Sequence, residues 1–169
     1  MKLPRRDLLF FTGAALIGCA RPPRAAGSPT APTGAAMKTR PLFTLRLEIG
    51  ALEKLPGTPA GDQVAFPVIG GHFEGERLRG KVLPGGADWT VERHDGVLEL
   101  DLRITLETHD GALIAMTFTG VRDDARAYLR TLPRFETAAP EYAFLNRLLA
   151  VGVGEIDAEG PRHVIEEIL

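Results

Sequence analysis

One stretch of the sequence alternates strictly between apolar and polar side chains. From Val97 to Thr108, every second residue is a leucine or an isoleucine, and the residues between them are mostly charged. Because successive side chains of a strand point to opposite sides, a period of two residues predicts a β-strand with one buried face. His94-Asp95-Gly96 before this stretch and His109-Asp110-Gly111 after it are typical of hairpin turns. The segment therefore predicts an antiparallel sheet with one buried and one solvated face.

Shorter alternations recur along the chain and are separated by glycine-rich and proline-rich breaks. Residues 42–49 place Phe43, Leu45, Leu47 and Ile49 on one face and polar residues on the other. We expect further strands at residues 64–69, 88–92, 112–120, 148–156 and 163–169. Between the strands we expect a loop at 57–61, a bent strand at 73–83, a turn at 84–86 and a short helix at 140–146.

These periodicities predict an all-β fold, either a sandwich or a barrel. About eight to ten short strands joined by local hairpins are typical of an up-and-down arrangement, and helical periodicity is weak throughout. A single closed or nearly closed antiparallel β-barrel, with one short helix, would also remove unpaired strand edges. The interior of a barrel of this size holds side chains or one small ligand.

Residues 1–18 have the order of features that marks a signal peptide. Paired arginines at positions 5 and 6 precede an apolar run from Leu8 to Ile17, which ends at Gly18-Cys19. The run is too short to cross a bilayer, for which about 20 apolar residues are needed. The arginine pair resembles a twin-arginine export signal, with the general secretory route as the alternative. The end of the run resembles a lipobox, so we expect Cys19 to be lipidated.

Residues 19–41 are rich in proline, glycine, alanine and threonine and lack apolar periodicity. This composition is typical of a flexible tether, which leaves residues 42–169 as one domain. Cys19 is the only cysteine, and lipidation would account for an unpaired thiol in an exported protein. We expect a periplasmic protein anchored to the outer membrane where the host has one, because Ala20 is not the aspartate that favours inner-membrane retention. Cleavage near Ala25-Ala26 would instead remove Cys19.

Several chemistries lack the residues that they need. The formal net charge is −2 and the basic residues are scattered, so we expect no nucleic-acid binding. The four histidines show no metal-ligand spacing, and we expect no metal site. No strand-to-helix unit follows Gly152-Val153-Gly154, and no Gly-x-Ser-x-Gly elbow occurs. We therefore expect no cofactor and no serine-hydrolase chemistry.

Three ordered groups of residues carry a resemblance to a known family. They contain the stretches GGHFEG (70–75), LRGKVLPGGADW (78–89), LDLR (100–103), THDGALI (108–114), RTLPRFET (130–137), YAFLN (142–146) and VGVG (151–154). In order and identity they resemble the domain-of-unknown-function 3237 family, also called uncharacterised protein family 0311, over residues 40–169. Two positions depart from the family pattern, which usually has tryptophan where Phe144 stands and often threonine or serine where His72 stands.

The resemblance implies a single antiparallel β-barrel, similar in shape to the lipocalins. It implies no defined activity, because the general function of the family is unassigned. Some relatives belong to natural-product pathways, where they assist ring closure or addition to a double bond. A cofactor-free role on a small molecule is therefore an expectation here, although similarity to lipocalins assigns no ligand by itself.

Two pairs of residues near the predicted turns are candidate sites. At a barrel mouth Trp89 could stack a flat ligand and Asp88 could accept its hydroxyl, or Trp89 belongs to the core and Asp88 caps the turn. Asp101 and Arg103 lie two residues apart and share one side of a strand. Facing the interior, they would supply an acid or base and an oxyanion partner; facing outward, they form a surface ion pair. The apolar opposite face favours the second arrangement and the family resemblance favours the first.

Two further candidates lie near the end of the chain. Arg134 and Glu136 share one face if the backbone is extended, and Pro133 favours an edge or rim position. There they could gate a ligand, with Glu136 as acid or base, or form a solvated ion pair. Tyr142 and Asn146 are spaced to share one face of the short helix. Asn146 could hydrogen-bond a ligand, or the helix only plugs the barrel.

These candidates support three functional hypotheses. In the first, a membrane-anchored barrel binds a small organic molecule. Its ligand-binding residues would be Asp88, Trp89, Arg103, Arg134 and Asn146. In the second, the protein is a cofactor-free lyase, cyclase or isomerase with Asp101 or Glu136 as the catalytic acid or base. In the third, it is a structural or interaction module with a filled interior. The sequence identifies no oligomer interface and leaves a homodimer open.

Overall fold

Nine antiparallel β-strands and two short 3₁₀-helices form residues 36–169, the part of the chain that this computed structural model describes. The strands are β1 (Thr39–Ile49), β2 (Glu53–Thr58), β3 (Gly61–Glu74), β4 (Arg79–Glu92), β5 (Leu98–Thr108), β6 (Leu113–Asp123), β7 (Tyr128–Glu136), β8 (Ala150–Asp157) and β9 (Gly160–Ile168). The helices are η1 (Asp124–Arg126) and η2 (Pro140–Arg147). Within these residues, no helix is both long and apolar enough to span a membrane.

The predicted signal peptide, the lipidation site Cys19 and most of the predicted tether lie outside the described residues. β1 begins at Thr39, so the strand includes residues 39–41, which the sequence predicts as the end of the tether. These residues pair with residues 166–168 of β9. Residues 39–41 are therefore part of β1 because they pair with a strand at the other end of the chain. A local sequence pattern does not reveal this pairing.

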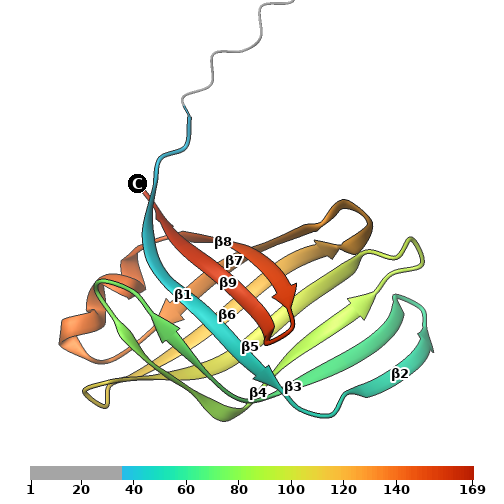
Figure 1. Ribbon diagram of the computed structural model, residues 1–169, viewed down its shortest axis with the longest axis horizontal. Coiled ribbons are helices and arrows are strands. Elements are labelled where there is room, and N and C mark those ends of the chain that lie inside the picture. The colour runs from blue at the N-terminus through green and yellow to red at the C-terminus, as the bar shows by residue number, and fades with distance from the viewer. Residues whose placement is uncertain (1–35) are drawn as a thin grey trace, which may run out of the picture. The chain divides into compact units, whose positions relative to one another are not determined.

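Hydrogen-bonded pairing closes the sheet into a barrel. The strand order is β1-β9-β8-β7-β6-β5-β4-β3-β2, and every neighbouring pair is antiparallel. Because β1 pairs with both β9 and β3, eight strands form a ring, and β2 lies outside it, paired with β3 alone. Figure 1 shows β1 and β9 side by side and β2 at one end of the barrel. The predicted closed, all-β barrel is confirmed.

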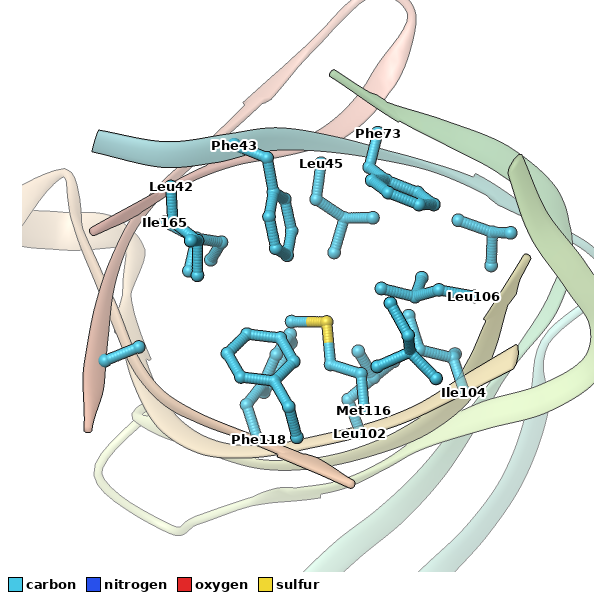
Figure 2. Packing of buried hydrophobic residues seen from close by; sticks show 14 of the residues in the cluster. Leu42, Phe43, Leu45, Phe73, Leu102, Ile104, Leu106, Met116, Phe118 and Ile165 are labelled. Atoms are coloured by element: carbon cyan, nitrogen blue, oxygen red, sulfur yellow. The ribbon is translucent and has the colours of Figure 1, made fainter. Parts of the chain in front are cut away.

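Side chains fill the half of the barrel next to η2. The inward-facing residues at its centre are each at most 1% exposed: Leu45, Phe73, Leu102, Leu106 and Met116. Figure 2 shows them pointing toward one another from opposite walls. From η2, Tyr142 and Leu145 are buried in the same core, and the Tyr142 hydroxyl donates to Asp110 in the β5–β6 turn over 3.0 Å. The predicted short helix therefore closes this end of the barrel.

The chain reverses direction at residues 75–78, inside the stretch 73–83 for which the sequence predicts one bent strand. Across the reversal, Glu74 of β3 pairs with Arg79 of β4. The prediction is wrong because a glycine-spaced run does not distinguish a bend from a reversal. Part of the predicted loop at 57–61 also belongs to a strand, since β2 extends to Thr58.

Pro84-Gly85-Gly86, predicted as a turn, is a bulge within β4. The register between β4 and β5 shifts between Leu83 and Ala87, and Gly85 has a φ of 106°, which glycine adopts without a Cβ clash. The bulge determines the direction of the side chains that follow it. Asp88 and Thr90 face the interior of the barrel, while Trp89 is 60% exposed on its outside.

β7 has a full ladder on one side only. It pairs with β6 along its whole length, but only Arg130 and Thr131 pair with β8. Pro133 lies beyond this short ladder, where one edge of β7 is unpaired, and such an edge tolerates a residue without an N–H group. This position agrees with the edge placement that the sequence predicts for Pro133.

Candidate functional site

The half of the barrel away from η2 contains a cavity of about 220 Å³ that is partly open to solvent. Most of its wall is apolar and consists of Leu47, Ile49, Leu52, Phe66, Leu98, Leu100, Leu129, Ile156 and Pro161. Its polar residues are Asp88, Thr90, Arg122 and His163. An apolar wall with a few polar groups is typical of sites for small organic molecules.

Asp88 fills an interruption in the β4–β5 ladder. The paired residues run from Asp88–Leu102 directly to Val91–Glu99, and the backbone N–H of Asp101 in this gap donates to the Asp88 carboxylate over 3.0 Å. Burial raises the pKa of Asp88 to about 6, although the hydrogen bond from the Asp101 N–H favours the ionised form. The site therefore holds a carboxyl group that titrates close to neutral pH.

His163 lies on the opposite wall, in β9. It is 3% exposed, and its ring packs against Phe118 with the ring centroids 5.2 Å apart. Burial lowers the pKa of His163 to about 4, so the imidazole is neutral at pH 7. Gly154 of β8 makes room for it, because a Cβ at Gly154 would lie 2.8 Å from His163 Nδ1 and 2.5 Å from Leu129. The second glycine of the VGVG stretch (151–154) therefore leaves space for two side chains that line the cavity, Leu129 and His163.

Two polar atoms of cavity-lining residues have no hydrogen-bond partner. In the described part of the chain, the buried side-chain atoms in this condition are Thr90 Oγ1, Thr131 Oγ1 and His163 Nδ1. Thr90 and His163 line the cavity. Because buried polar atoms are normally paired, a bound molecule is a candidate partner for this wall.

Arg122 lines the cavity at the end of β6, where the strand meets η1. Asp124 holds its guanidinium through two hydrogen bonds of 2.7 and 2.9 Å. The arginine is therefore already paired at the rim, and its charge is partly compensated. The deeper polar groups, Asp88 and Thr90, remain free to contact a ligand.

The structure places Asp101 and Arg103 on the outer face of β5, where they do not line the cavity. Their side chains are 42% and 69% exposed and form an ion pair of 3.1 Å. The residues that alternate with them, including Leu102, are buried in the core. The interior arrangement considered from the sequence is therefore not the one observed, because the apolar face of β5 occupies the inside of the barrel. The exposed neighbours form a surface ion pair instead.

Arg134 and Glu136 are also exposed, because the buried positions of β7 alternate with them. Asn146 is engaged within the fold: its amide oxygen accepts from the Thr137 N–H and its amide nitrogen donates to the Thr137 carbonyl, both over 2.9 Å. Trp89 faces outward, because adjacent residues of a strand cannot both face the interior. Of the site residues predicted from the sequence in the described part of the chain, Asp88 lines the cavity. The others do not line it: Trp89, Asp101, Arg103, Arg134, Glu136 and Asn146.

Thr90, Arg122 and His163 line the cavity but are absent from the sequence-based candidates. A signal for His163 exists in the sequence, since it shares the strand face of the buried Ile165 two residues later. Thr90 likewise shares its face with Asp88. A polar residue at an apolar position of an alternating strand is therefore the pattern that indicates this site.

Comparison with known proteins places the barrel in a family. Residues 37–168 match the family described as "Protein of unknown function (DUF3237)". The chain belongs to this family. A UPF0311 protein of Rhodopseudomonas palustris strain TIE-1 is 33% identical over 132 residues, covering 69% of this chain and 86% of that protein.

Solved structures share the DUF3237 barrel. A β-barrel-like protein from Acinetobacter baumannii has a TM-score of 0.75 at 28% identity, covering 82% of this chain and 100% of the other. A conserved protein of unknown function from Rhodopseudomonas palustris has a TM-score of 0.76 at 30% identity, with coverages of 80% and 100%. The descriptions of these relatives name no ligand, so function is argued here from the cavity.

Proposed function

We propose that this DUF3237 barrel binds a small, largely apolar organic molecule in its cavity. The observation that carries the proposal is the cavity itself, an apolar-walled space of about 220 Å³ whose wall includes the half-buried carboxylate of Asp88 and the buried hydroxyl of Thr90. A purely structural barrel would fill this space with side chains, as the half next to η2 does. The unfilled half therefore favours a binding role over the structural alternative.

Filling the cavity with a larger side chain tests this proposal. Leu98 lines the cavity, whereas Leu132 is 60% exposed on the outside of the barrel. Leu98→Trp adds an indole ring inside and Leu132→Trp adds the same ring outside. We expect the full-length protein and Leu132→Trp to bind the neutral dye N-phenyl-1-naphthylamine, and Leu98→Trp to bind at least about tenfold more weakly by fluorescence titration. Equal binding by all three proteins, or none by the unsubstituted protein, would contradict the proposal.

A second function, cofactor-free proton transfer, is favoured by Asp88. Burial raises the pKa of this carboxyl group to about 6. An acid or base catalyst is most efficient when its pKa lies near the pH at which the enzyme works. A lyase, cyclase or isomerase acting in this cavity would use Asp88 as its acid or base. Asp101 and Glu136 lie outside the barrel and could not reach a molecule in the cavity.

The fate of a bound molecule distinguishes the two functions. Ligand recovered from the purified protein is incubated with fresh protein in heavy water and analysed by mass spectrometry. An enzyme would convert the ligand or exchange one of its hydrogens for deuterium, and Asp88→Asn would stop this reaction. A binding protein would return the ligand unchanged.

We also propose that the barrel works outside the cytoplasm, anchored through a lipid on Cys19. The support is the order of features in residues 1–19: paired arginines, an apolar run and a lipobox-like end. An anchored barrel with an apolar cavity would hold its ligand beside a membrane, in which apolar molecules concentrate.

A further inference from the structure

The chemistry of the cavity wall restricts the group by which a ligand is held. Thr90 is 1% exposed and its hydroxyl oxygen has no hydrogen-bond partner. The adjacent inward-facing residue on the same strand is Asp88, whose carboxylate accepts one backbone N–H from Asp101 and has capacity for further donors. The wall therefore presents a hydrogen-bond acceptor beside a hydroxyl, in a cavity lined mostly by leucine and other apolar side chains.

We propose that the cavity recognises an uncharged, largely apolar molecule through a single hydroxyl group, which donates its hydrogen to Asp88 and accepts one from Thr90. A hydroxyl both donates and accepts through a single oxygen atom, so it matches this pair of residues. The proposal rests on the proposed binding function, to which it adds the chemical class of the ligand, an alcohol or a phenol.

Other common polar groups match the wall less well. A ligand carboxylate would place a second negative charge beside Asp88 and would have no hydrogen to donate. A ketone or ether only accepts, so it would give the Asp88 carboxylate no donor beyond the Asp101 N–H. An ammonium group could pair with Asp88, but it offers no acceptor to Thr90 and would share the cavity with the guanidinium of Arg122.

Three aromatic probes of similar shape test the inference on the full-length protein. 2-Naphthol carries the hydroxyl, 2-methylnaphthalene replaces it by a methyl group of similar size, and 2-naphthoate carries a carboxylate. By fluorescence titration near neutral pH, we expect 2-naphthol to bind at least about tenfold more tightly than 2-methylnaphthalene, because a hydrogen bond to a charged acceptor is lost in the second probe. We expect 2-naphthoate to bind most weakly.

Variants assign the preference to individual residues. Asp88→Asn keeps an oxygen that can accept the Asp101 N–H but removes the charge, and Thr90→Val removes the hydroxyl at nearly constant volume. We expect each to reduce the preference for 2-naphthol to less than about threefold. Glu136→Gln makes the same carboxylate-to-amide change on the outer face and should leave the preference unchanged.

The outcomes separate this inference from the binding function beneath it. Equal binding of 2-naphthol and 2-methylnaphthalene, with both weakened by Leu98→Trp, would overturn hydroxyl recognition and leave cavity binding standing. A preference that persists in both Asp88→Asn and Thr90→Val would also overturn it. If none of the three probes binds, both the inference and the proposed binding function fail.

Discussion

At the scale of single residues, the cavity contains two titratable groups that burial shifts in opposite directions. Asp88 has a pKa of about 6 in the folded protein against 3.8 for an exposed aspartate. His163 has a pKa of about 4 against 6.5 for an exposed histidine. Both side chains favour their neutral forms, because removal from water penalises charge. The stability of the fold therefore depends on pH through two opposing contributions.

The sign of each contribution follows from which state binds protons more tightly. Folded Asp88 retains its proton better than the unfolded chain does, so its contribution is present below about pH 4 and is lost as the pH rises to about 6. Unfolded His163 binds its proton better, so its contribution is present above about pH 6.5 and is lost as the pH falls to about 4. Between these values the two largely cancel.

Replacing either side chain should reveal the pH dependence that the other contributes to the free energy of unfolding. In His163→Gln, the free energy of unfolding should fall by about 3 kcal/mol, relative to the unsubstituted protein, as the pH rises from about 4 to about 6. In Asp88→Asn, it should rise by a similar amount over the same range. Urea denaturation at a series of pH values measures both. Profiles that stay parallel to that of the unsubstituted protein would show that neither group is buried as described.

At the scale of elements, the strands follow from local pattern, whereas their junctions depend on side-chain contacts. η2 illustrates this, because no side chain caps its first turn. Instead, Asn146 in its last turn makes two hydrogen bonds to the backbone of Thr137, and the Thr137 hydroxyl donates to the Leu113 carbonyl over 2.7 Å. These bonds join η2 to β6 and β7 and hold the closed end of the barrel.

Asn146 is therefore expected to matter for stability and not for binding. Asn146→Ala should lower the free energy of unfolding by about 1–3 kcal/mol, because it leaves backbone groups of Thr137 without partners. Binding of N-phenyl-1-naphthylamine to the folded variant should stay within about twofold of the unsubstituted protein, since the cavity is at the other end. Arg147→Ala, at the exposed neighbouring residue, is the control. Loss of dye binding without loss of stability would instead support the ligand role that the sequence suggests for Asn146.

At the scale of the whole molecule, one barrel combines a packed half with a hollow half. The packed half and η2 give the fold a core, and the hollow half carries the polar groups proposed to bind a ligand. The N-terminal segment carries the proposed export signal and lipid-anchor site. The packed core, the proposed binding site and the proposed export signal thus lie in separate parts of the chain.

The proposed address predicts the mass of the mature protein. Purified from the membranes of its own host, the protein should begin at Cys19 and carry a diacylglyceryl group, as intact-protein mass spectrometry would show. Cys19→Ala should release the protein from the membrane fraction. An unmodified protein that begins after Ala25 or Ala26 would contradict the lipid anchor while leaving export intact.

Much of the fold is predictable from the sequence because strand periodicity is a local property. The alternating stretch from Val97 to Thr108 contains β5 (Leu98–Thr108), whose apolar residues occupy the interior. The turns at Asp95-Gly96 and Asp110-Gly111 are equally local, since Gly96 and Gly111 adopt φ values of 82° and 87° that favour glycine. Together, the alternation, the turn residues and the family resemblance were enough to predict an all-β barrel.

The candidate site was decided by the tertiary structure. Alternation shows that Asp88 and Thr90 share a face, but the bulge at residues 84–86 and the pairing with β5 decide that this face is the interior. His163 reaches the same cavity because β9 pairs with β1, whose residues lie more than 100 positions away in the chain. Which face of a strand becomes the inside of a barrel depends on how the ring closes. Closure is a long-range pairing, and no local pattern of residues contains it.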